Sequence, residues 1–474
     1  MSSSIKDATK ASQYFTLIKQ SLKGEEMDYT QGSISKAVIM LAIPMMLEMM
    51  MESVFALVDL YFVGHLKESS LAIQTVGLTE SVLTIMYSIA IGMSMAATAV
   101  VSRRVGEKNP DEAAHGGAQA IIIASAITIV LSVLGAVFAE DILLLMGASA
   151  EAAAHGKTFT AIMMGSSISI MLLFLINGIF RGAGNAAIAM KSLWVANVCN
   201  ILLCPILING WGVIPAFGLT GAAMATAIGR SVGVLYQCYH LFGGKGLMRL
   251  TARHFRMDME IMKSLIKIAT PGIFQFVIAS CSWVVLARLV AVNGGDEASA
   301  GYQTALRLMM FFLLPAWGMS NAASTLAGQN LGANNPQRAE DAVLRTVKYN
   351  VIYMIVVSVI FFSMANWLVA FFTEDLAVQE VAKTAMYILA CGFVFYGIGM
   401  VMINAFNGAG DTWTPTKVNF VGFWLFQIPL AYVLAQYFQL GAIGVFIAVP
   451  VSETMITIAS FILFKKGKWK LKKV

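Results

Sequence analysis

Long apolar runs, separated by short polar segments, follow one another along almost the whole of this 474-residue chain. Each run reaches the roughly 20 residues that an α-helix needs to cross a bilayer and is too long for a barrel strand. Because only helices and closed barrels span lipid, the pattern predicts an all-α, polytopic membrane protein with twelve transmembrane helices. The predicted spans lie near residues 34–64, 72–101, 117–139, 157–180, 190–210, 216–241, 262–293, 300–327, 347–372, 381–405, 416–437 and 440–464.

The second half of this pattern repeats the first. VSRRVGEKNPDEA (101–113) returns as AGQNLGANNPQRA (327–339), and FRGAGN (180–185) returns as FNGAGD (406–411), with the same offset in both cases. Glycine followed by Asn, Asp or Asn-Pro is typical of a helix exit and the N-cap of the next helix. Six helices per repeat is an even number, so both halves enter the membrane with the same orientation. We therefore expect two six-helix lobes related by an axis along the membrane normal.

The division into lobes follows from these spans. The first lobe is expected at 34–241 and the second at 262–464, with a basic cytoplasmic linker at 242–261 between them. A cytoplasmic N-terminal tail (1–33) and a basic cytoplasmic C-terminal tail (465–474) complete the expected organisation.

Charge sets the expected orientation and partners. The chain is 58% hydrophobic and only 12% charged, with a net charge of +6. Its basic residues gather in alternate connections, where Arg103 and Arg181 are expected, and in the linker and C-terminal tail. The positive-inside rule then places both termini in the cytoplasm, with the protein in the inner or plasma membrane. The expected partners are small-molecule substrates and the lipid bilayer, not nucleic acid, and the chain is expected to be a monomer.

Three carboxylates interrupt the first span: Glu48, Glu52 and Asp59. On an α-helix they fall within about 40° of one another, so one stripe carries all three. A charged carboxylate at mid-membrane costs at least ~2.5 kcal/mol and usually marks an ion or substrate path. The stripe therefore predicts an ion-coupling site in this helix. The alternative is that one or two of these acids are structural, paired with a buried arginine or bonded to a neighbouring helix.

The matching stripe of the second lobe carries no acid. It reads Gln275, Ala279 and Leu286, because Pro44 in the first span corresponds to Pro271 in the seventh. A group that binds and releases an ion must change its protonation or coordination, which amide and alkyl side chains cannot do. We therefore expect a single ion site, in the first lobe, with the span at 262–293 serving the drug pathway or packing.

Five further charged residues fall inside the predicted spans: Glu80, Arg230, Arg288, Arg307 and Glu453. Structural pairing is expected for Arg230 and Glu453, whereas the other three are open between pairing, snorkelling and function. Intramembrane amides such as Asn177 could equally be hydrogen-bonding glue between helices. Pro44 lacks a backbone N–H and is the expected bending point of the first helix.

Motifs of catalysis and nucleotide binding are absent from the sequence. It has no GxxxxGK[ST] phosphate loop, no nucleophile elbow and no HExxH, and its five histidines are scattered. The chain is accordingly not expected to be an enzyme, to use ATP or to need a cofactor.

Taken together, several short motifs resemble the multidrug and toxic compound extrusion (MATE) family. They are Pro44 fifteen residues before Asp59 in VDLYFVGHL, the FRGAGN and FNGAGD turns, the run NVCNILLCPILI (197–208) and the segment Leu219–Ala225. The resemblance covers residues 34–464 and implies a cation-coupled antiporter with two six-helix lobes around a central cavity. It further implies that Asp59 is the protonatable or sodium-binding acid, with Asn200 and Thr226 beside it.

The sequence departs from the family pattern at two positions. Relatives often carry an aspartate four residues after the asparagine that matches Asn200 in the fifth predicted span, where this chain has Cys204. Some carry a glutamate in the seventh predicted span, where this chain has Ala279. The first-lobe position equivalent to Ala279 is Glu52, so the ion site is expected to be shifted into the first lobe.

The sequence thus favours a proton- or sodium-coupled antiporter that exports lipophilic, cationic small molecules by alternating access. Its expected ion-coupling residues are Asp59, Glu52, Glu48, Asn200 and Thr226, with no metal beyond sodium at Asp59. Its expected substrate pathway contains Gln275, Asn177 and Arg307, and its hinge is Pro44. Two alternatives stay open: a flippase for lipid-linked oligosaccharides, for which Arg288 and Arg307 would supply a cationic cavity, and a non-transporting membrane sensor or channel.

Overall fold

The fold is all-α. The computed structural model describes residues 13, 15–25, 27–64, 69–243, 246 and 248–474, and within them the β-structure is a single bridge between Trp211 and Ile214. Nine described helices are long and apolar enough to cross a membrane, and a pair bent by 56° makes a tenth. One of the nine contains two consecutive spans, and a further 25-residue helix follows the fifth. The predicted integral membrane protein with twelve spans is therefore confirmed.

The first lobe contains the first six spans. Its helices are α2 (Ile34–Gly64), α3 (Ser69–Gly106), α4 (Pro110–Val137), α5 (Ala139–Leu145), α6 (Ala150–Gly165), α7 (Ser167–Gly182), α8 (Ala186–Asn209) and α9 (Leu219–Gly243). The short α5 precedes the fourth span, which α6 and α7 form together.

The second lobe contains the remaining six spans. Its elements are α10 (Met259–Gly332), α11 (Pro336–Ala370), α12 (Leu376–Ala390), α13 (Phe393–Gly408), α14 (Trp413–Asn419), η2 (Phe420–Gln427), α15 (Ile428–Tyr432), η3 (Val433–Tyr437) and α16 (Gly441–Lys465). The predicted spans 262–293 and 300–327 are both in α10, which continues through the polar connection between them and breaks only at Gly295, where φ is +71°. α14 to η3 form one span whose π-helical turns flank Pro429, a residue that cannot donate an i→i−4 hydrogen bond.

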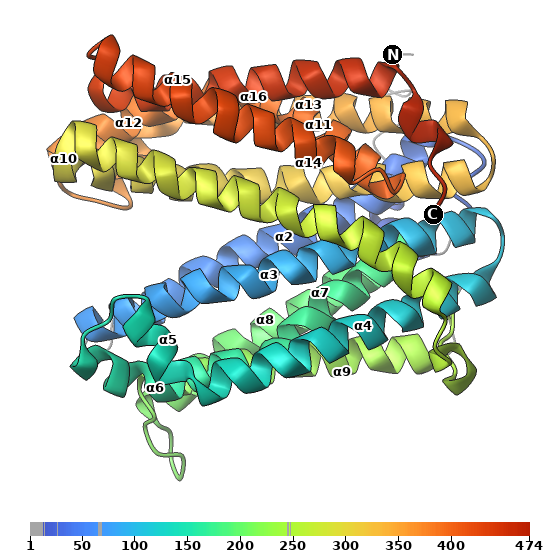
Figure 1. Ribbon diagram of the computed structural model, residues 1–474, viewed down its shortest axis with the longest axis horizontal. Helices are drawn as coiled ribbons and strands as arrows, with labels where there is room; N and C mark the ends of the chain where they lie inside the picture. Colours follow the sequence, from blue (N-terminus) through green and yellow to red (C-terminus); the bar gives the residue numbers. More distant parts are fainter. Residues whose placement is uncertain (1–12, 14, 26, 65–68, 244–245, 247) are drawn as a thin grey trace, which may run out of the picture.

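Figure 1 shows the two lobes one above the other. The helices of the first lobe, in blue to green, and those of the second, in yellow to red, approach each other at the end that carries the C-terminus. They diverge toward the opposite end, where α10 turns back on itself. The two lobes meet mainly through α2 and α3 of the first and α10 of the second.

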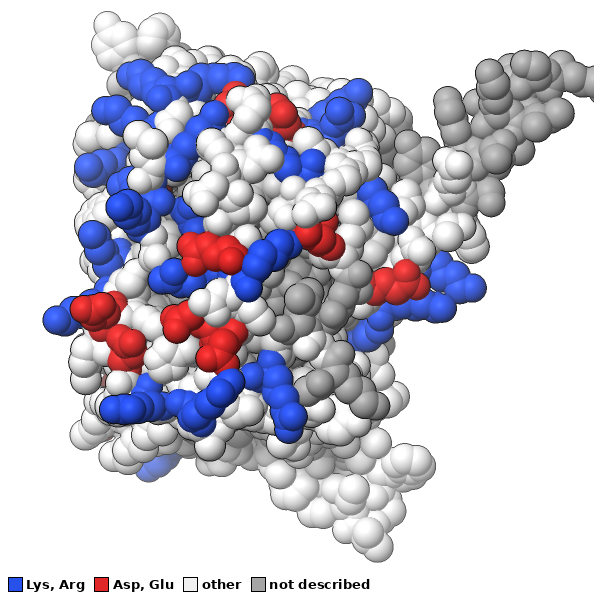
Figure 2. Space-filling view, turned by 90° about the vertical axis from the view of Figure 1, so that its right-hand side faces the viewer, with Lys and Arg blue, Asp and Glu red and all other residues white. Residues whose placement is uncertain are grey.

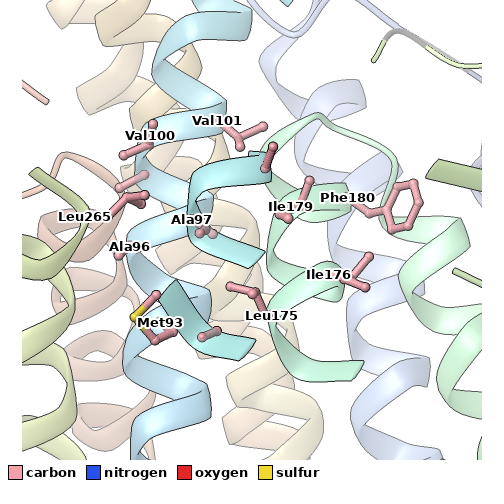
Figure 3. Packing of buried hydrophobic residues seen from close by; sticks show 14 of the residues in the cluster. Met93, Ala96, Ala97, Val100, Val101, Leu175, Ile176, Ile179, Phe180 and Leu265 are labelled. Carbon is pink, nitrogen blue, oxygen red and sulfur yellow. The ribbon is translucent and has the colours of Figure 1, made fainter. Parts of the chain in front are cut away.

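Small side chains let the helices of the first lobe pack closely. Ala96, Ala97 and Val101 of α3 face Ile176 and Ile179 of α7, all almost fully buried, as Figure 3 shows. Leu265 of α10 joins the same cluster from the second lobe. Lipid gives little hydrophobic driving force between helices, so close packing of small residues has to supply much of the association.

The repeated turns have the predicted geometry. Gly184 and Gly410 end their helices with φ of +90° and +82°, a conformation that favours glycine. Asn185 caps α8 by accepting a hydrogen bond from the Ile188 N–H. The predicted cap at Asp411 is wrong, because α14 begins one residue later, after Thr412, and Asp411 instead accepts from the Thr414 hydroxyl.

The helix starts predicted at the two Asn-Pro pairs are confirmed in both lobes. Asn109 accepts a hydrogen bond from the Glu112 N–H at the start of α4, and Asn335 accepts one from the Arg338 N–H at the start of α11. In each helix the proline is the first residue, where no intrahelical partner for its N–H would exist.

Repeat glycines form the contact between the lobes. A Cβ at Gly106 would lie 2.0 Å from the Gln329 carbonyl oxygen, and a Cβ at Gly332 would lie 2.1 Å from the Arg103 carbonyl oxygen. Arg103 and Gln329 occupy matching positions of the repeat, as do the two glycines, so the contact is reciprocal. The Gln329 side chain also donates to the Gly182 carbonyl across the interface. Glycine is required here because α3 and α10 approach backbone to backbone.

The cytoplasmic linker lies against the end of α4. Gln119 donates to the carbonyl oxygens of His254 and Arg256, and its own side-chain oxygen accepts from the Asp258 N–H. Asp258 caps α10, and the backbone N–H groups of Ile261 and Glu260 hold its pKa below the usual range.

Figure 2 looks onto the end of the molecule where the lobes meet, and Lys and Arg side chains predominate there. The C-terminal residues Lys465, Lys470 and Lys472 belong to this end, paired with Glu340 or Asp411. Arg103 and Arg181, both predicted to lie in cytoplasmic connections, are largely buried instead. The Arg103 side chain binds the carbonyl oxygens of Ala409 and Lys472, and Arg181 lies inside the first lobe.

Candidate functional site

The first two acids of the α2 stripe, Glu48 and Glu52, face the interior of the first lobe, and Glu48 is held by two other residues. The carboxylate of Glu48, 1% exposed, accepts a hydrogen bond from Asn177 at 2.9 Å and lies 3.3 Å from the Arg181 guanidinium. Asn177 in turn accepts from Ser192 and Gln237, so its side-chain oxygen is also occupied. A buried carboxylate in such a network is compensated by an adjacent positive charge and fixed in place.

The second acid has its own arginine. Arg230 of α9 forms a bidentate pair with Glu52, at 2.8 and 3.4 Å, and Asn197 of α8 adds a hydrogen bond at 3.0 Å. The guanidinium also lies 5.0 Å from the centre of the Phe55 ring. The expected structural pairing of Arg230 is thereby confirmed, with Glu52 as its partner.

The third acid, Asp59, is on α2, but its side chain lies outside the described residues. Its expected neighbours are present and in contact with each other: the Asn200 amide donates to the Thr226 hydroxyl at 2.9 Å, and both residues are buried. Asn200 is one turn beyond Asn197 on α8, and Thr226 is one turn before Arg230 on α9. The Asn200–Thr226 pair is therefore one turn further along the lobe than the Glu52 pair.

A small cavity adjoins Thr226. It has a volume of about 20 Å3, and Glu80 of α3, an exposed residue, is part of its lining. This volume suits a single water molecule or a small ion. Glu80, whose role was open from the sequence, thus lies in the same part of the first lobe as Asn200 and Thr226.

In the second lobe an amide pair takes the place of the Glu48 pair. Gln275 of α10 and Asn407 of α13 exchange hydrogen bonds of 3.0 and 3.3 Å, and Gln275 also donates to the Thr412 carbonyl. Gln275 matches Glu48, and Asn407 occupies the repeat position of Arg181. The contact between the first and fourth spans is therefore ionic in the first lobe, and the corresponding contact in the second lobe is neutral.

The second lobe also contains a mainly apolar cavity with a volume of about 310 Å3. Gln275, expected on the substrate pathway, lies in its wall, together with Ala279 and Met95 of α3. Glu453 of α16 faces the same space and is 6% exposed. The expected pairing of Glu453 is wrong for the described residues, since its buried Oε1 has no hydrogen-bond partner and no ion pair is formed.

The remaining expected residues are spread over the molecule. Arg307 and Arg288 of α10 are both exposed, and neither lines the second-lobe cavity. Asn177 is bonded within the first lobe and does not contact that cavity. Pro44 is buried inside α2, which continues as one helix from Ile34 to Gly64.

The sequence reasoning missed Arg181 as a partner of the acid stripe, whereas Asn197 is one of the intramembrane amides expected to form hydrogen bonds between helices. The sequence predicts a cytoplasmic position for Arg181 because it follows an apolar run, yet its side chain is only 11% exposed. Asn197 is three residues before Asn200, at helical spacing on the same side of α8, and this spacing was the available signal. Nothing local marks either residue as the partner of an acid so distant in the sequence.

Known proteins of one family match the chain along most of its length. The MatE family profile matches twice, at residues 44–206 and 271–433, once in each lobe. The chain is 25% identical to a probable multidrug resistance protein, NorM, of Thermotoga maritima, over 97% of both chains. It is 22% identical to the multidrug export protein MepA of Staphylococcus aureus, over 93% of this chain and 96% of that protein.

A solved structure has the same fold. It is described as the outward-facing conformation of a multidrug resistance MATE family transporter of the MOP superfamily. It superposes with a TM-score of 0.88 at 24% identity, over 94% of this chain and 98% of the other. Two six-helix lobes, the doubled family match and these relatives lead to one conclusion: the chain belongs to the MATE family of membrane transporters.

Proposed function

We propose that this protein is a multidrug exporter that exchanges protons or sodium ions for lipophilic cations by alternating access of its two lobes. The names of the Thermotoga maritima and Staphylococcus aureus relatives support multidrug export. The cation coupling rests on the acids of the first lobe. We further propose a monomer in the plasma membrane, with both termini in the cytoplasm and no cofactor.

The observation that carries this proposal is the way the lobes meet. They touch at the basic end through Gly106 and Gly332 and diverge toward the other end. With the basic end in the cytoplasm, this is an arrangement closed to the inside. Two similar bodies that meet at one end can rock about an axis between them, as inverted and parallel repeats do in other secondary transporters.

We assign ion coupling to Asp59, with Asn200 and Thr226 beside it and Glu80 nearby. A coupling acid has to gain and lose its ion in each cycle. Glu48 and Glu52 each have an arginine in hydrogen-bonding contact, which offsets their charge without any transported ion. In this proposal Glu48 and Glu52 do not bind the transported ion. Their contacts hold α2 in position against α7, α8 and α9.

The flippase alternative is less well supported. A pyrophosphate-linked sugar calls for several cationic groups in one cavity. Arg288 and Arg307 are exposed on the second lobe, and the described wall of its cavity contains Glu453 but neither Lys nor Arg.

Transport by purified protein in liposomes tests the proposal. A proton gradient and a sodium gradient are imposed separately, and uptake of a fluorescent lipophilic cation is measured against each. We expect one gradient to drive accumulation and Asp59→Asn to abolish it. Full gradient-driven transport by Asp59→Asn, or no response to either gradient in the wild type, would refute the proposal.

A further inference from the structure

Two segments near the ends of the chain cross from one lobe to the other at the basic end of the molecule. The N-terminal segment (27–33) leads into α2 of the first lobe, and the C-terminal segment (466–474), which contains η4 (Lys468–Leu471), follows α16 of the second lobe. Each segment is bound by an arginine of the opposite lobe. Arg338 of α11 binds the N-terminal segment, and Arg103 of α3 binds the C-terminal segment.

The C-terminal segment is fixed to the second lobe by Trp469. This side chain is fully buried, stacks on Phe464 and belongs to a cluster of second-lobe side chains that includes Leu331. The Lys472 ammonium group lies 3.2 Å from the Asp411 carboxylate of the same lobe. The segment is therefore expected to move together with the second lobe.

Arg103 reaches the C-terminal segment from the first lobe. Its guanidinium donates to the Lys472 carbonyl oxygen at 2.9 Å and to the Ala409 carbonyl oxygen at 3.4 Å. The side chain is buried at the end of α3, and both acceptors belong to the second lobe. This single residue therefore ties α3 to the second lobe and to the chain segment that follows it.

The N-terminal segment is fixed to the first lobe in a similar way. The buried Tyr29 donates its hydroxyl to the Gly184 carbonyl oxygen, in the turn between α7 and α8, at 3.1 Å. Asp28 forms an ion pair of 2.7 Å with Lys108, just before α4. Because the segment also continues directly into α2, it is expected to move together with the first lobe.

Arg338 reaches the N-terminal segment from the second lobe. Its guanidinium donates to the carbonyl oxygens of Gln31, Gly32 and Tyr29, at 2.7, 3.0 and 3.3 Å. The planar fork of donors on arginine suits several acceptors at once, and hydrogen bonds from a charged donor are roughly twice as strong as neutral ones. The acceptors are backbone carbonyl groups, so water can take over both sides of the contact when it opens.

These contacts lie where the lobes would have to separate. At the same end of the molecule α3 and α10 touch through Gly106 and Gly332. If the lobes part here, Arg103 moves away from the Lys472 carbonyl and Arg338 moves away from the N-terminal segment. Opening of the basic end therefore breaks both arginine contacts, whereas the contacts that fix each segment to its own lobe can persist.

We propose that the two terminal segments are straps that hold the basic end of the molecule closed, and that Arg103 and Arg338 are the contacts that fasten and release them. The place of this closure in a transport cycle rests on the function proposed above. The straps themselves do not, because the closed and open arrangements can be measured without a substrate or a gradient.

The distance between spin labels on the two lobes, measured by pulsed electron resonance in lipid nanodiscs, tests this inference. The labels are attached through Tyr239→Cys in α9 and Arg345→Cys in α11, two exposed positions, after the five natural cysteines are replaced by alanine. The wild type should give one main distance. Arg103→Met and Arg338→Met should each add a longer one and lower the closed-to-open ratio about tenfold or more, the loss expected for hydrogen bonds to a charged group.

Arg104→Met is the matched control. Arg104 follows Arg103 in α3 but pairs with Glu107 of its own helix, so its substitution removes the same charge from the same end without touching a strap. It should leave the label distances unchanged. Wild-type distances in both Arg103→Met and Arg338→Met, or an equal shift in Arg104→Met, would overturn the proposal.

Trp469→Ala covers the case in which Arg103→Met does not fold. It frees the C-terminal segment from the second lobe and should also lower the closed-to-open ratio, by less than Arg103→Met because the contact with Ala409 remains. Wild-type distances in a folded Trp469→Ala protein would overturn the role of the C-terminal strap. If the arginine variants open as expected but neither gradient drives transport by the wild type, the straps stand and the antiport proposal fails.

Discussion

The two lobes share a backbone plan and differ in charge at the same places. Glu48 and Arg181 form an ion pair between the first and fourth spans, and Gln275 and Asn407 form an amide pair between the corresponding spans of the second lobe. One turn further along α2, the first lobe pairs Glu52 with Arg230. The second lobe leaves a cavity beside Glu453.

Glycines, caps and turns have been retained where the backbone needs them, while the polar interior has diverged. Gly182 packs against the Thr98 carbonyl as Gly408 packs against the Ser324 carbonyl, and each residue of one pair occupies the repeat position of its counterpart in the other. Helix crossings therefore constrain these glycine positions sterically, whereas the polar pair between the same two helices has changed in both charge and size. Glu48 and Glu52 of the first lobe are each paired with an arginine, whereas Glu453 of the second lobe has no ion pair among the described residues.

The largest effect is expected from breaking the Glu52 pair. Arg230→Met leaves a buried carboxylate without its cation and should lower the free energy of unfolding by about 3–5 kcal/mol. Denaturation in detergent measures the loss. Adding Glu52→Gln to Arg230→Met should recover part of it, because the unpaired charge is gone. A loss below about 1 kcal/mol would show that the pair is solvated and behaves like a surface salt bridge.

A smaller effect is expected from converting the Glu48 pair to its second-lobe form. Arg181→Asn alone leaves Glu48 without its arginine, and Glu48→Gln alone leaves Arg181 without its carboxylate, so both should destabilise the protein. The double substitution recreates the pairing of Gln275 with Asn407. It should cost less than the sum of the single changes by about 1–3 kcal/mol, the coupling typical of contacting residues. Simple additivity would contradict the equivalence of the two pairs.

The smallest effect concerns the matching prolines. Pro44→Ala restores a helical hydrogen bond worth about 0.5–1.5 kcal/mol and should slow turnover by about two- to tenfold, with little change in substrate affinity. Pro271→Ala is the matched change in the second lobe, where the Pro271 carbonyl already accepts from the Thr416 hydroxyl and is held in place. Turnover should therefore respond more to Pro44→Ala, as initial transport rates would show. An unchanged rate with reduced affinity would exclude Pro44 as a hinge.

Much of the fold was predictable because its signals are local. Apolar runs give the twelve spans, and Gly184, Asn109 and Asn335 mark helix ends through their own backbone preferences. The connection around Gly295 was less predictable, since a single residue with positive φ is enough to turn the chain between two spans.

The site was predictable only in part. The stripe of acids on α2 follows from helical spacing, but spacing on one helix does not show which residues face it from others. Arg181 and Arg230 reach Glu48 and Glu52 from α7 and α9, and these contacts depend on how the helices pack. Glu453 shows the reverse case: a charge expected to be paired lines a cavity because the facing residue, Ala279, is small.

The most direct test of this division between the lobes compares Asp59→Asn with Glu453→Gln in proteoliposomes. Gradient-driven accumulation of tetraphenylphosphonium is measured over a range of substrate concentrations, alongside its binding to the purified proteins. Asp59→Asn should bind the cation but fail to accumulate it. Glu453→Gln should keep gradient-driven accumulation, because the proposed ion site is in the first lobe. Accumulation by Asp59→Asn, or loss of coupling in Glu453→Gln with its affinity intact, would place the ion site in the second lobe and contradict the account.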